Sequence, residues 1–255
     1  MDKIIEINSV NLIYHSKKFE TLALNDLNLT INKGEFVSIV GPSGCGKTTI
    51  LSLISGLLKP TKGEILVDNT KPDLKSTKCG YMFQKDNLLP WRSIERNVYL
   101  GLEIQHKNTK ENREYALNLL KKYGLENFSK KRPDELSGGM RQRVALIRTL
   151  ALKPEILLLD EPFSALDFQT RLSVCDDVAN IIKKEEKTAI LVTHDLNEAI
   201  SMSDKIFVLT ARPGTVKAIH TLDFDKNLTP FEKRNTQKSK ALFDKIWSEI
   251  QNEQD

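Results

Sequence analysis

Residues 41–49 form the first group with clear chemical potential, because they fit the phosphate-binding pattern Gly-x-x-x-x-Gly-Lys-Ser/Thr. Glycines let consecutive backbone N–H groups point at phosphate oxygens, and a following helix adds positive potential at its N-terminus. We expect Lys47 to reach the β- and γ-phosphates of a nucleotide and the Thr48 hydroxyl to bind Mg²⁺, with Cys45 as a filler. The predicted nucleotide contacts are Gly41, Pro42, Ser43, Gly44, Cys45, Gly46, Lys47, Thr48 and Thr49.

Two acids follow the apolar run 156–159. At the end of a buried strand, Asp160 can hold Mg²⁺ directly or through water. The next residue, Glu161, can polarise an attacking water as a general base. Ligands bind at the carboxyl ends of strands in α/β sheets, so we expect both acids to face the nucleotide. A phosphate-binding loop alone fits kinases, GTPases and ATPases. The acid pair narrows the choice among these enzyme classes.

A second anion-binding device lies further along the chain. Ser137 offers a hydroxyl, and Gly138 and Gly139 offer bare N–H groups at the start of a predicted helix. Taken alone, the triplet is also an ordinary helix start. A single bound nucleotide has no obvious need for two such devices on one chain.

The elements that must position these groups alternate between short apolar strands and helices. Strands are expected at 4–14, 21–31, 36–40, 63–67, 78–83, 156–159, 188–192 and 205–209. Helices are expected from Lys47 to near Pro60 and at 94–104, 110–123, 139–152, 172–184 and 196–201, with one or two more amphipathic helices at 230–251. This alternation predicts an α/β fold with a mainly parallel sheet covered on both faces.

The composition fits one large α/β domain, with 255 residues, 40% hydrophobic and 28% charged. No apolar run approaches the roughly 18–20 residues of a membrane span, and the N-terminus lacks signal-peptide features. We therefore expect a cytoplasmic protein, for which any membrane role must come through a partner. The net charge of +4 comes from mixed-sign runs, which favours solvated helix faces over a nucleic-acid surface. The cysteines and histidines have neither disulfide nor zinc-site spacing.

With these motifs in place, the sequence resembles the ABC (ATP-binding cassette) ATPase family over nearly its whole length. The segment 136–143, Leu-Ser-Gly-Gly-Met-Arg-Gln-Arg, is similar to the signature motif of that family, with Met140 in place of the commoner glutamine. The resemblance implies a P-loop NTPase core with an N-terminal antiparallel β subdomain and an inserted α-helical subdomain. It also implies a homodimer on ATP binding, in which each ATP lies between one P-loop and the signature motif of the other copy.

The expected domain organisation follows from the same resemblance. Residues 1–229 form the ATPase domain, with its core at 1–90 and 153–229 and its helical subdomain at about 91–152. Residues 230–255 form a C-terminal helical tail, which could be either a regulatory segment or a packing element.

Further site residues are implied by matches to family motifs. Gln84 resembles the glutamine that senses Mg²⁺ and the γ-phosphate, and Asp167 ends a Ser-Ala-Leu-Asp segment like the one that crosses the dimer interface. His194 resembles the switch histidine that contacts the γ-phosphate and orients Glu161. Catalysis is therefore expected from Glu161, His194, Lys47 and Gln84, with metal binding by Thr48, Gln84 and Asp160.

The adenine contact is expected from an aromatic residue in the first strand. Tyr14 resembles the family residue that stacks on adenine, with His15 and Phe19 as nearby alternatives.

The segment 87–98 follows Gln84 and contains Trp91. In the family, this surface receives a coupling helix of the membrane permease, and aromatic residues favour interface centres. We expect the Gln84–Asn97 region to contact a permease, although Trp91 could instead pack within the helical subdomain. Together with the segment 211–215, Ala-Arg-Pro-Gly-Thr, these motifs resemble the importer branch for nitrate, sulfonates and taurine.

The interpretation is an ATP-hydrolysing importer subunit on the inner face of the cell membrane, which works with a permease and indirectly with a solute-binding protein. A soluble ABC ATPase acting on nucleic acid or ribosomes is the alternative, but those proteins usually carry two cassettes, zinc modules or long coiled coils. A P-loop kinase would not explain Gln84, His194 and the 137–139 motif together. The chain itself does not touch the transported solute, so its residues do not identify that solute.

Overall fold

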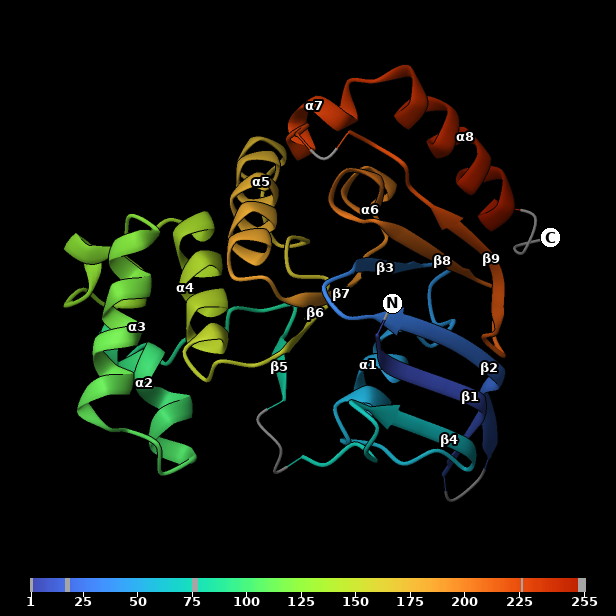
Figure 1. The fold of residues 1–255 in the computed structure, drawn as a ribbon, viewed down its shortest axis with the longest axis horizontal. Helices are drawn as coiled ribbons and strands as arrows, with labels where there is room; N and C mark the ends of the chain where they lie inside the picture. The colour runs from blue at the N-terminus through green and yellow to red at the C-terminus, as the bar shows by residue number, and fades with distance from the viewer. Residues whose placement is uncertain (1, 17–18, 75–77, 226, 252–255) are drawn as a thin grey trace. The chain divides into compact units, whose positions relative to one another are not determined.

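The computed structural model describes residues 2–16, 19–74, 78–225 and 227–251. The chain forms two compact units (Figure 1). The first unit comprises Met1–Ser76 and Ile182–Asp255, and the second comprises Thr77–Ile181.

The first unit contains an antiparallel sheet of three strands. These are β1 (Lys3–His15), β2 (Glu20–Asn32) and β4 (Lys62–Val67), and β1 lies in the centre. Buried and exposed side chains alternate along parts of β1, as expected for a sheet with one covered face. The expected antiparallel N-terminal sheet is therefore confirmed.

The same unit contains the strands β3 (Phe36–Val40), β7 (Thr188–Val192), β8 (Lys205–Leu209) and β9 (Val216–Thr221). Strand β3 pairs in parallel with both β7 and β8, while β9 pairs antiparallel with β8. All side chains of β3 and β7 are buried, which is why their sequences are nearly continuous apolar runs. The sequence analysis did not predict β9, because only one of its six side chains is buried and its apolar pattern is weak.

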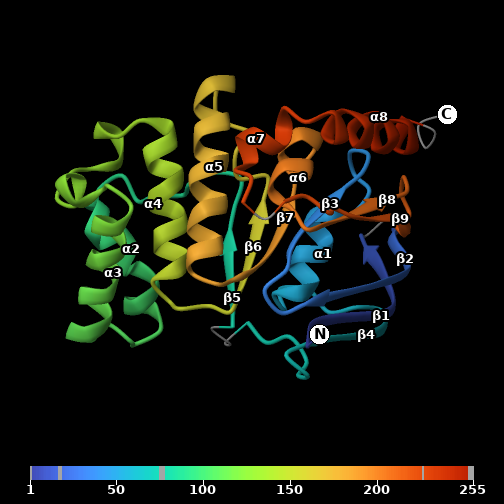
Figure 2. The ribbon, with the colours of Figure 1, turned by 45° about the horizontal axis from the view of Figure 1, so that its top comes forward.

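Helix α1 (Lys47–Ile54) begins directly after the phosphate-binding loop and lies between the two groups of strands of the first unit (Figures 1 and 2). Its apolar residues recur at three- and four-residue spacing and are buried, among them Ile50, Leu51 and Ile54. The helix is shorter than expected. It ends at Ile54 rather than near Pro60, because the chain turns at Gly56, which has a φ of 78°.

The remaining helices of the first unit are α6 (Leu196–Met202), α7 (Pro230–Arg234) and α8 (Gln237–Gln251). Helices α6 and α8 bury a common core with β3 and β8, formed by Val40, Leu196, Ala199, Ile200, Ile206, Val208, Leu222 and Ile246. The predicted C-terminal tail is thus helical and packs on this unit, although its residues 252–255 lie outside the described part of the chain.

The second unit combines two parallel strands with four helices. The strands are β5 (Cys79–Met82) and β6 (Ile156–Asp160). The helices are α2 (Ile94–Ile104), α3 (Lys110–Lys122), α4 (Gly138–Leu150) and α5 (Phe168–Lys184), whose last residues belong to the first unit. Short 3₁₀ turns lie at Glu126–Phe128 and Pro133–Glu135.

The boundaries expected for the helical subdomain, at about 91 and 152, stay a prediction; α2, α3 and α4 lie within them. No helix in the described ranges is long and apolar enough to cross a membrane.

Candidate nucleotide site

The phosphate-binding loop is organised by its own lysine. The Lys47 ammonium donates hydrogen bonds to the carbonyl oxygens of Gly41 and Pro42, both at 2.9 Å, and the side chain is buried. Gly46 precedes α1 with a φ of 103°, which an L side chain rarely adopts, and an added Cβ there would lie 2.7 Å from Leu24. The loop therefore needs glycine at this position both for conformation and for space.

The N-terminus of α1 is open to an anion. No side chain of the described residues caps this helix, and its first turn carries no acidic residue. Its first N–H groups and the positive end of the helix dipole therefore suit phosphate oxygens.

A loop after β8 supports the phosphate-binding loop from within the first unit. A Cβ added at Gly214 would overlap the backbone oxygen of Cys45, so only glycine allows this close approach. Gly214 also exchanges backbone hydrogen bonds with the β2 segment, at 2.9 Å to Ala23 and 3.1 Å from Asn25. Burial raises the pKa of the Cys45 thiol, which fits its predicted role as a filler.

Tyr14 lies beside the first turn of α1. Its hydroxyl is 3.0 Å from the Thr49 hydroxyl, while 42% of the residue stays exposed. Of the two alternatives, His15 pairs with Glu20 at 3.0 Å, and Phe19 is 73% exposed. Tyr14 is thus tied to the phosphate-binding loop, and its contact with adenine stays a prediction.

His194 follows β7, and the residues on both sides of it are held in place. The Thr193 hydroxyl donates to the Glu198 carboxylate at 2.6 Å and accepts the Asp195 N–H at 3.0 Å. Asp195 in turn caps α6 by accepting the N–H groups of Asn197 and Glu198. Glu198 is only 6% exposed. The sequence analysis missed Thr193 and Glu198, although a Thr-His-Asp-x-x-Glu run at a helix start signals such a cap.

In the second unit, Asp160 is the last residue of β6 and Glu161 follows it. The Tyr81 hydroxyl, on the neighbouring strand β5, donates to Asp160 Oδ2 at 3.0 Å and so fixes the carboxylate. Glu161 has a φ of 44°, a left-handed conformation that is uncommon for a residue with a side chain. Such conformations cost free energy and gather at functional sites, which fits a catalytic role for Glu161.

A hydrogen-bond chain joins three of the predicted motifs in the second unit. The Gln84 amide donates to the Ser164 hydroxyl at 3.1 Å, and this hydroxyl donates to the Glu161 carbonyl oxygen at 3.0 Å. Ser164 is 80 residues from Gln84, so sequence spacing gave no sign of this link.

Ser137 and Asp167 both lie at helix starts. The Ser137 hydroxyl accepts the Met140 N–H at 3.3 Å and so caps α4, whose first two residues are Gly138 and Gly139. Asp167 accepts the Thr170 N–H at 3.1 Å, and hydrogen bonds from the Thr170 side chain and backbone lower the pKa of Asp167. A serine that accepts from its own helix still has its hydroxyl proton to donate to a phosphate.

Residues 84–97 are named here the Trp91 loop; they comprise a surface loop at 84–93 and the first turn of α2. The Asn97 side chain is fully buried and accepts the Leu89 N–H at 2.7 Å. It also donates to the carbonyl oxygens of Leu89, Arg92 and Ser93. Trp91 itself is 70% exposed, so it does not pack within the helical part of the unit.

The predicted site residues are thus divided between the units. The first unit carries residues 41–49, Tyr14 and His194, and the second carries Gln84, residues 137–139, the two acids and Asp167. In the first unit, a long-range hydrogen bond joins Tyr14 to Thr49. In the second unit, long-range hydrogen bonds join Tyr81 to Asp160 and Gln84 to Ser164.

Comparison with known proteins decides the family. The sequence profile of the ABC transporter family matches residues 24–164. The chain belongs to this family. As an ABC ATPase it binds ATP, and its predicted α/β class and its predicted ATPase activity are confirmed.

The relatives match this chain over most of its length. The chain is 49% identical over 247 residues to the uncharacterized ABC transporter ATP-binding protein YtlC of Bacillus subtilis, which is 96% of this chain and 95% of that protein. It is 41% identical over 219 residues to the nitrate import ATP-binding protein NrtD of Synechocystis, which is 86% of this chain and 82% of that protein. Among solved structures, the dimeric ATP-binding cassette MJ0796 bound to ADP and Pi matches with a TM-score of 0.73 and 36% identity, covering 87% of this chain and 100% of that chain.

Proposed function

We propose that this chain is the nucleotide-binding subunit that powers an importer of a small anionic solute of the nitrate or sulfonate class. The observation that carries the proposal is the Trp91 loop, which presents a largely exposed tryptophan from a buried hydrogen-bonded frame. An exposed aromatic side chain on a rigid loop suits a permanent protein partner better than solvent. The similarity to a nitrate import ATP-binding protein supports the solute class.

ATP binds through the phosphate-binding loop of one copy, with Lys47 on the β- and γ-phosphates and Tyr14 against adenine. The 137–139 motif of a second copy contacts the same γ-phosphate, so ATP joins two copies head to tail. The similarity to a dimeric cassette bound to ADP and Pi supports this arrangement. Asp167 lies near the interface in the same scheme.

Mg²⁺ would be held by the Thr48 hydroxyl and Asp160, with Gln84 near it. These are the oxygen donors that Mg²⁺ prefers. Among the described residues there is no cluster of three or more His, Cys, Asp or Glu that could hold a metal. This fits Mg²⁺, which usually takes only one or two carboxylates and completes its shell with phosphate oxygens and water. When bound, the ion neutralises charge on the transferred phosphoryl group.

The chain's own groups then carry out hydrolysis. Glu161 accepts a proton from the attacking water, and His194 contacts the γ-phosphate and orients Glu161. ATP favours the closed dimer because it touches both copies only in that state, and its hydrolysis removes this bridge. Opening and closing move the permease through the Gln84–Asn97 region, so the chain works as a peripheral subunit at the inner face of the membrane. The solute-binding protein acts through the permease.

The Glu161→Gln variant tests this function. It should bind ATP but lose about 10²–10⁴-fold in turnover, since a general base contributes that much. Light scattering should show a monomer without nucleotide and a stable dimer with Mg-ATP. Glu155→Gln, an exposed position just before β6, is the matched control and should keep turnover.

Two outcomes would contradict the proposal. Rapid hydrolysis by Glu161→Gln would remove the assignment of the general base. Salt-sensitive binding of the wild-type protein to nucleic acid, without association with a membrane permease, would favour a soluble ABC ATPase instead.

A further inference from the structure

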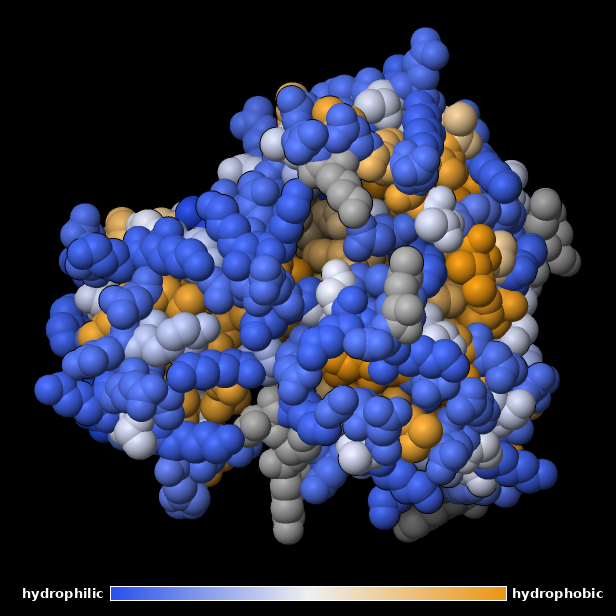
Figure 3. Space-filling view, in the orientation of Figure 1, coloured by the Kyte–Doolittle hydropathy of each residue, from blue (hydrophilic) through white to orange (hydrophobic). Residues whose placement is uncertain are grey.

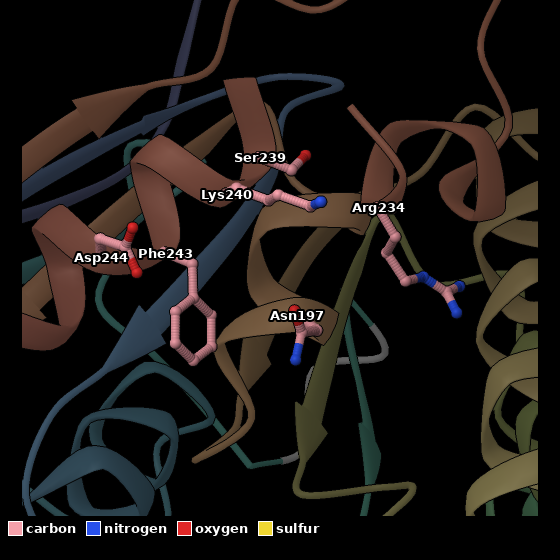
Figure 4. Close-up of a pocket in the computed structure, with 6 residues that line it drawn as sticks. All are labelled: Asn197, Arg234, Ser239, Lys240, Phe243 and Asp244. Atoms are coloured by element: carbon pink, nitrogen blue, oxygen red, sulfur yellow. The ribbon is translucent and has the colours of Figure 1, made fainter. Parts of the chain in front are cut away.

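The C-terminal helices α7 and α8 form an open pocket with α6 in the first unit. Its volume is about 340 Å³, at the lower end of the range for small-molecule sites. Its walls come from three helices of the first unit, and the lining residues are Asn197, Arg234, Ser239, Lys240, Phe243 and Asp244 (Figure 4). None of these residues belongs to the predicted nucleotide site.

The polar side of this pocket is cationic. In Figure 4 the Lys240 side chain extends in the direction of Arg234, whose guanidinium points away from it, and Asn197 lies below Lys240. The acid of the lining, Asp244, lies on the other side of Phe243 in this view. A guanidinium, an ammonium and an amide are hydrogen-bond donors of the kind that recognise the oxygens of an anion.

The surrounding segment also carries an excess of positive charge. Residues 230–245 contain five cations (Lys233, Arg234, Lys238, Lys240 and Lys245) and two acids (Glu232 and Asp244), so the segment has a net charge of +3. Burial lowers the pKa of Lys233, and nearby Lys183 lowers it further, while Asp204 opposes both effects. A bound anion would offset this crowding of cations.

The other side of the pocket is apolar. Phe243 packs partly on the core of the first unit and stacks on Trp247, with ring centroids 6.1 Å apart and ring planes 11° apart. Figure 3 shows apolar surface in the area of α8 and β9 within an otherwise largely hydrophilic face. The Ser239 hydroxyl donates to the Lys233 carbonyl oxygen, so the donors for a ligand come from the cations and Asn197. The pocket thus offers donors at one side and an aromatic ring at the other.

We propose that this pocket binds a small organic oxyanion with a short apolar part, such as an alkyl sulfonate or carboxylate. Arg234 and Lys240 hold the charged group, and Phe243 contacts the apolar part. The pocket lies close in sequence to the predicted switch, because Asn197 is the second residue of α6 and its N–H is bound by Asp195, the N-cap of that helix and the neighbour of His194. This site is independent of the proposed transport function, and its test does not measure ATPase activity.

The test uses Trp247 as a reporter. The chain has two tryptophans, so Trp91→Phe leaves Trp247 as the single tryptophan, which can be excited selectively and is stacked on the pocket residue Phe243. Sodium butanesulfonate is added at constant ionic strength, with saturating ADP to occupy the phosphate-binding loop. We expect a saturable fluorescence change and a higher Tm, because a ligand that binds only the folded state stabilises it. The neutral analogue 1-butanol should produce neither effect.

Substitutions in this background assign the effect to the pocket. Arg234→Gln and Lys240→Gln should each weaken binding at least about tenfold, as expected for the loss of a charge-assisted hydrogen bond. Lys245→Gln, an exposed cation on the same helix that does not line the pocket, should bind as before. Lys240 is exposed, so Lys240→Gln decides the question if Arg234→Gln does not fold.

The proposal is overturned if butanesulfonate causes no saturable change in either fluorescence or Tm. It is equally overturned if Lys240→Gln binds as tightly as Lys245→Gln, since the anion would then bind elsewhere on the chain.

Discussion

The phosphate-binding loop and the Trp91 loop both lead into a helix, but they prepare the helix start in opposite ways. Helix α1 has no side-chain cap, and Lys47 bonds to carbonyl oxygens only five and six residues away. Helix α2 is capped by Ser93, and Asn97 satisfies the backbone of the loop before it. A loop that binds a ligand through its backbone leaves its N–H groups open, whereas a loop that presents a side chain closes them.

The two loops also differ in where their support comes from. The phosphate-binding loop is held by hydrogen bonds of its own lysine and by the close packing of Gly214. The Trp91 loop is held in addition by Arg148 of α4, which donates to the carbonyl oxygens of Asp86 and Asn87 about 60 residues away. Changes in the first loop should therefore remove chemistry, while changes in the second should affect stability and partner binding.

The largest effect is expected at Lys47. Lys47→Ala should lower kcat by about 10²–10³-fold, because it removes a positive charge that stabilises the transferred phosphoryl group. It should also weaken nucleotide binding. Steady-state ATPase assays and titration with a fluorescent ATP analogue measure the two effects. Normal binding and turnover in a folded variant would show that the loop does not act on phosphate through this lysine.

The second prediction concerns the frame of His194. Glu198→Ala removes the acceptor of the Thr193 hydroxyl, whose bond of 2.6 Å fixes the turn before α6. We expect kcat to fall about 10- to 100-fold with little change in the KM for ATP, because a misplaced group costs transition-state stabilisation more than ground-state binding.

A conservative variant separates positioning from simple structural damage. Glu198→Gln keeps a side-chain oxygen that can accept from Thr193, so it should retain most of the activity lost in Glu198→Ala. Equal losses in both variants, or a loss that follows the Tm alone, would remove the positioning role.

Much of the difference between the two loops could be predicted from the sequence, because the residues with chemical roles lie in contiguous motifs. The strands 36–40, 188–192 and 205–209 and the helix 94–104 were predicted with the bounds that the structure gives them. Buried apolar runs and amphipathic periodicity are local signals, so a single sequence carries them.

The supporting residues could not be predicted in the same way. Tyr81 reaches Asp160 and Gln84 reaches Ser164 across about 80 residues, and no spacing rule connects such pairs. Strand β9 was missed because its stability comes from pairing with β8 rather than from its own pattern. Such long-range contacts can be identified only once the fold is known.

The smallest effects should come from the Trp91 loop. Two substitutions there distinguish the residue that holds the loop in place from the residue that the loop exposes. Asn97→Ala removes the acceptor of the part-buried Leu89 N–H, so it should lower the free energy of unfolding by about 1–3 kcal/mol. Trp91→Ala removes a side chain that is 70% exposed and should change stability by no more than about 0.5 kcal/mol. Urea denaturation measures both values.

Trp91→Ala should keep the basal ATPase rate of the isolated subunit and lose association with the permease, measured by co-purification in detergent. The reason is that Trp91 lies outside the phosphate-binding groups and supplies the exposed aromatic area on which such an interface depends. Asn97→Ala should lose the same association even where its ATPase rate survives, because the frame that presents Trp91 is gone. If Trp91→Ala instead kept the permease and lost stability, its side chain would be part of the packing of the unit, and the contrast between the two loops would fail.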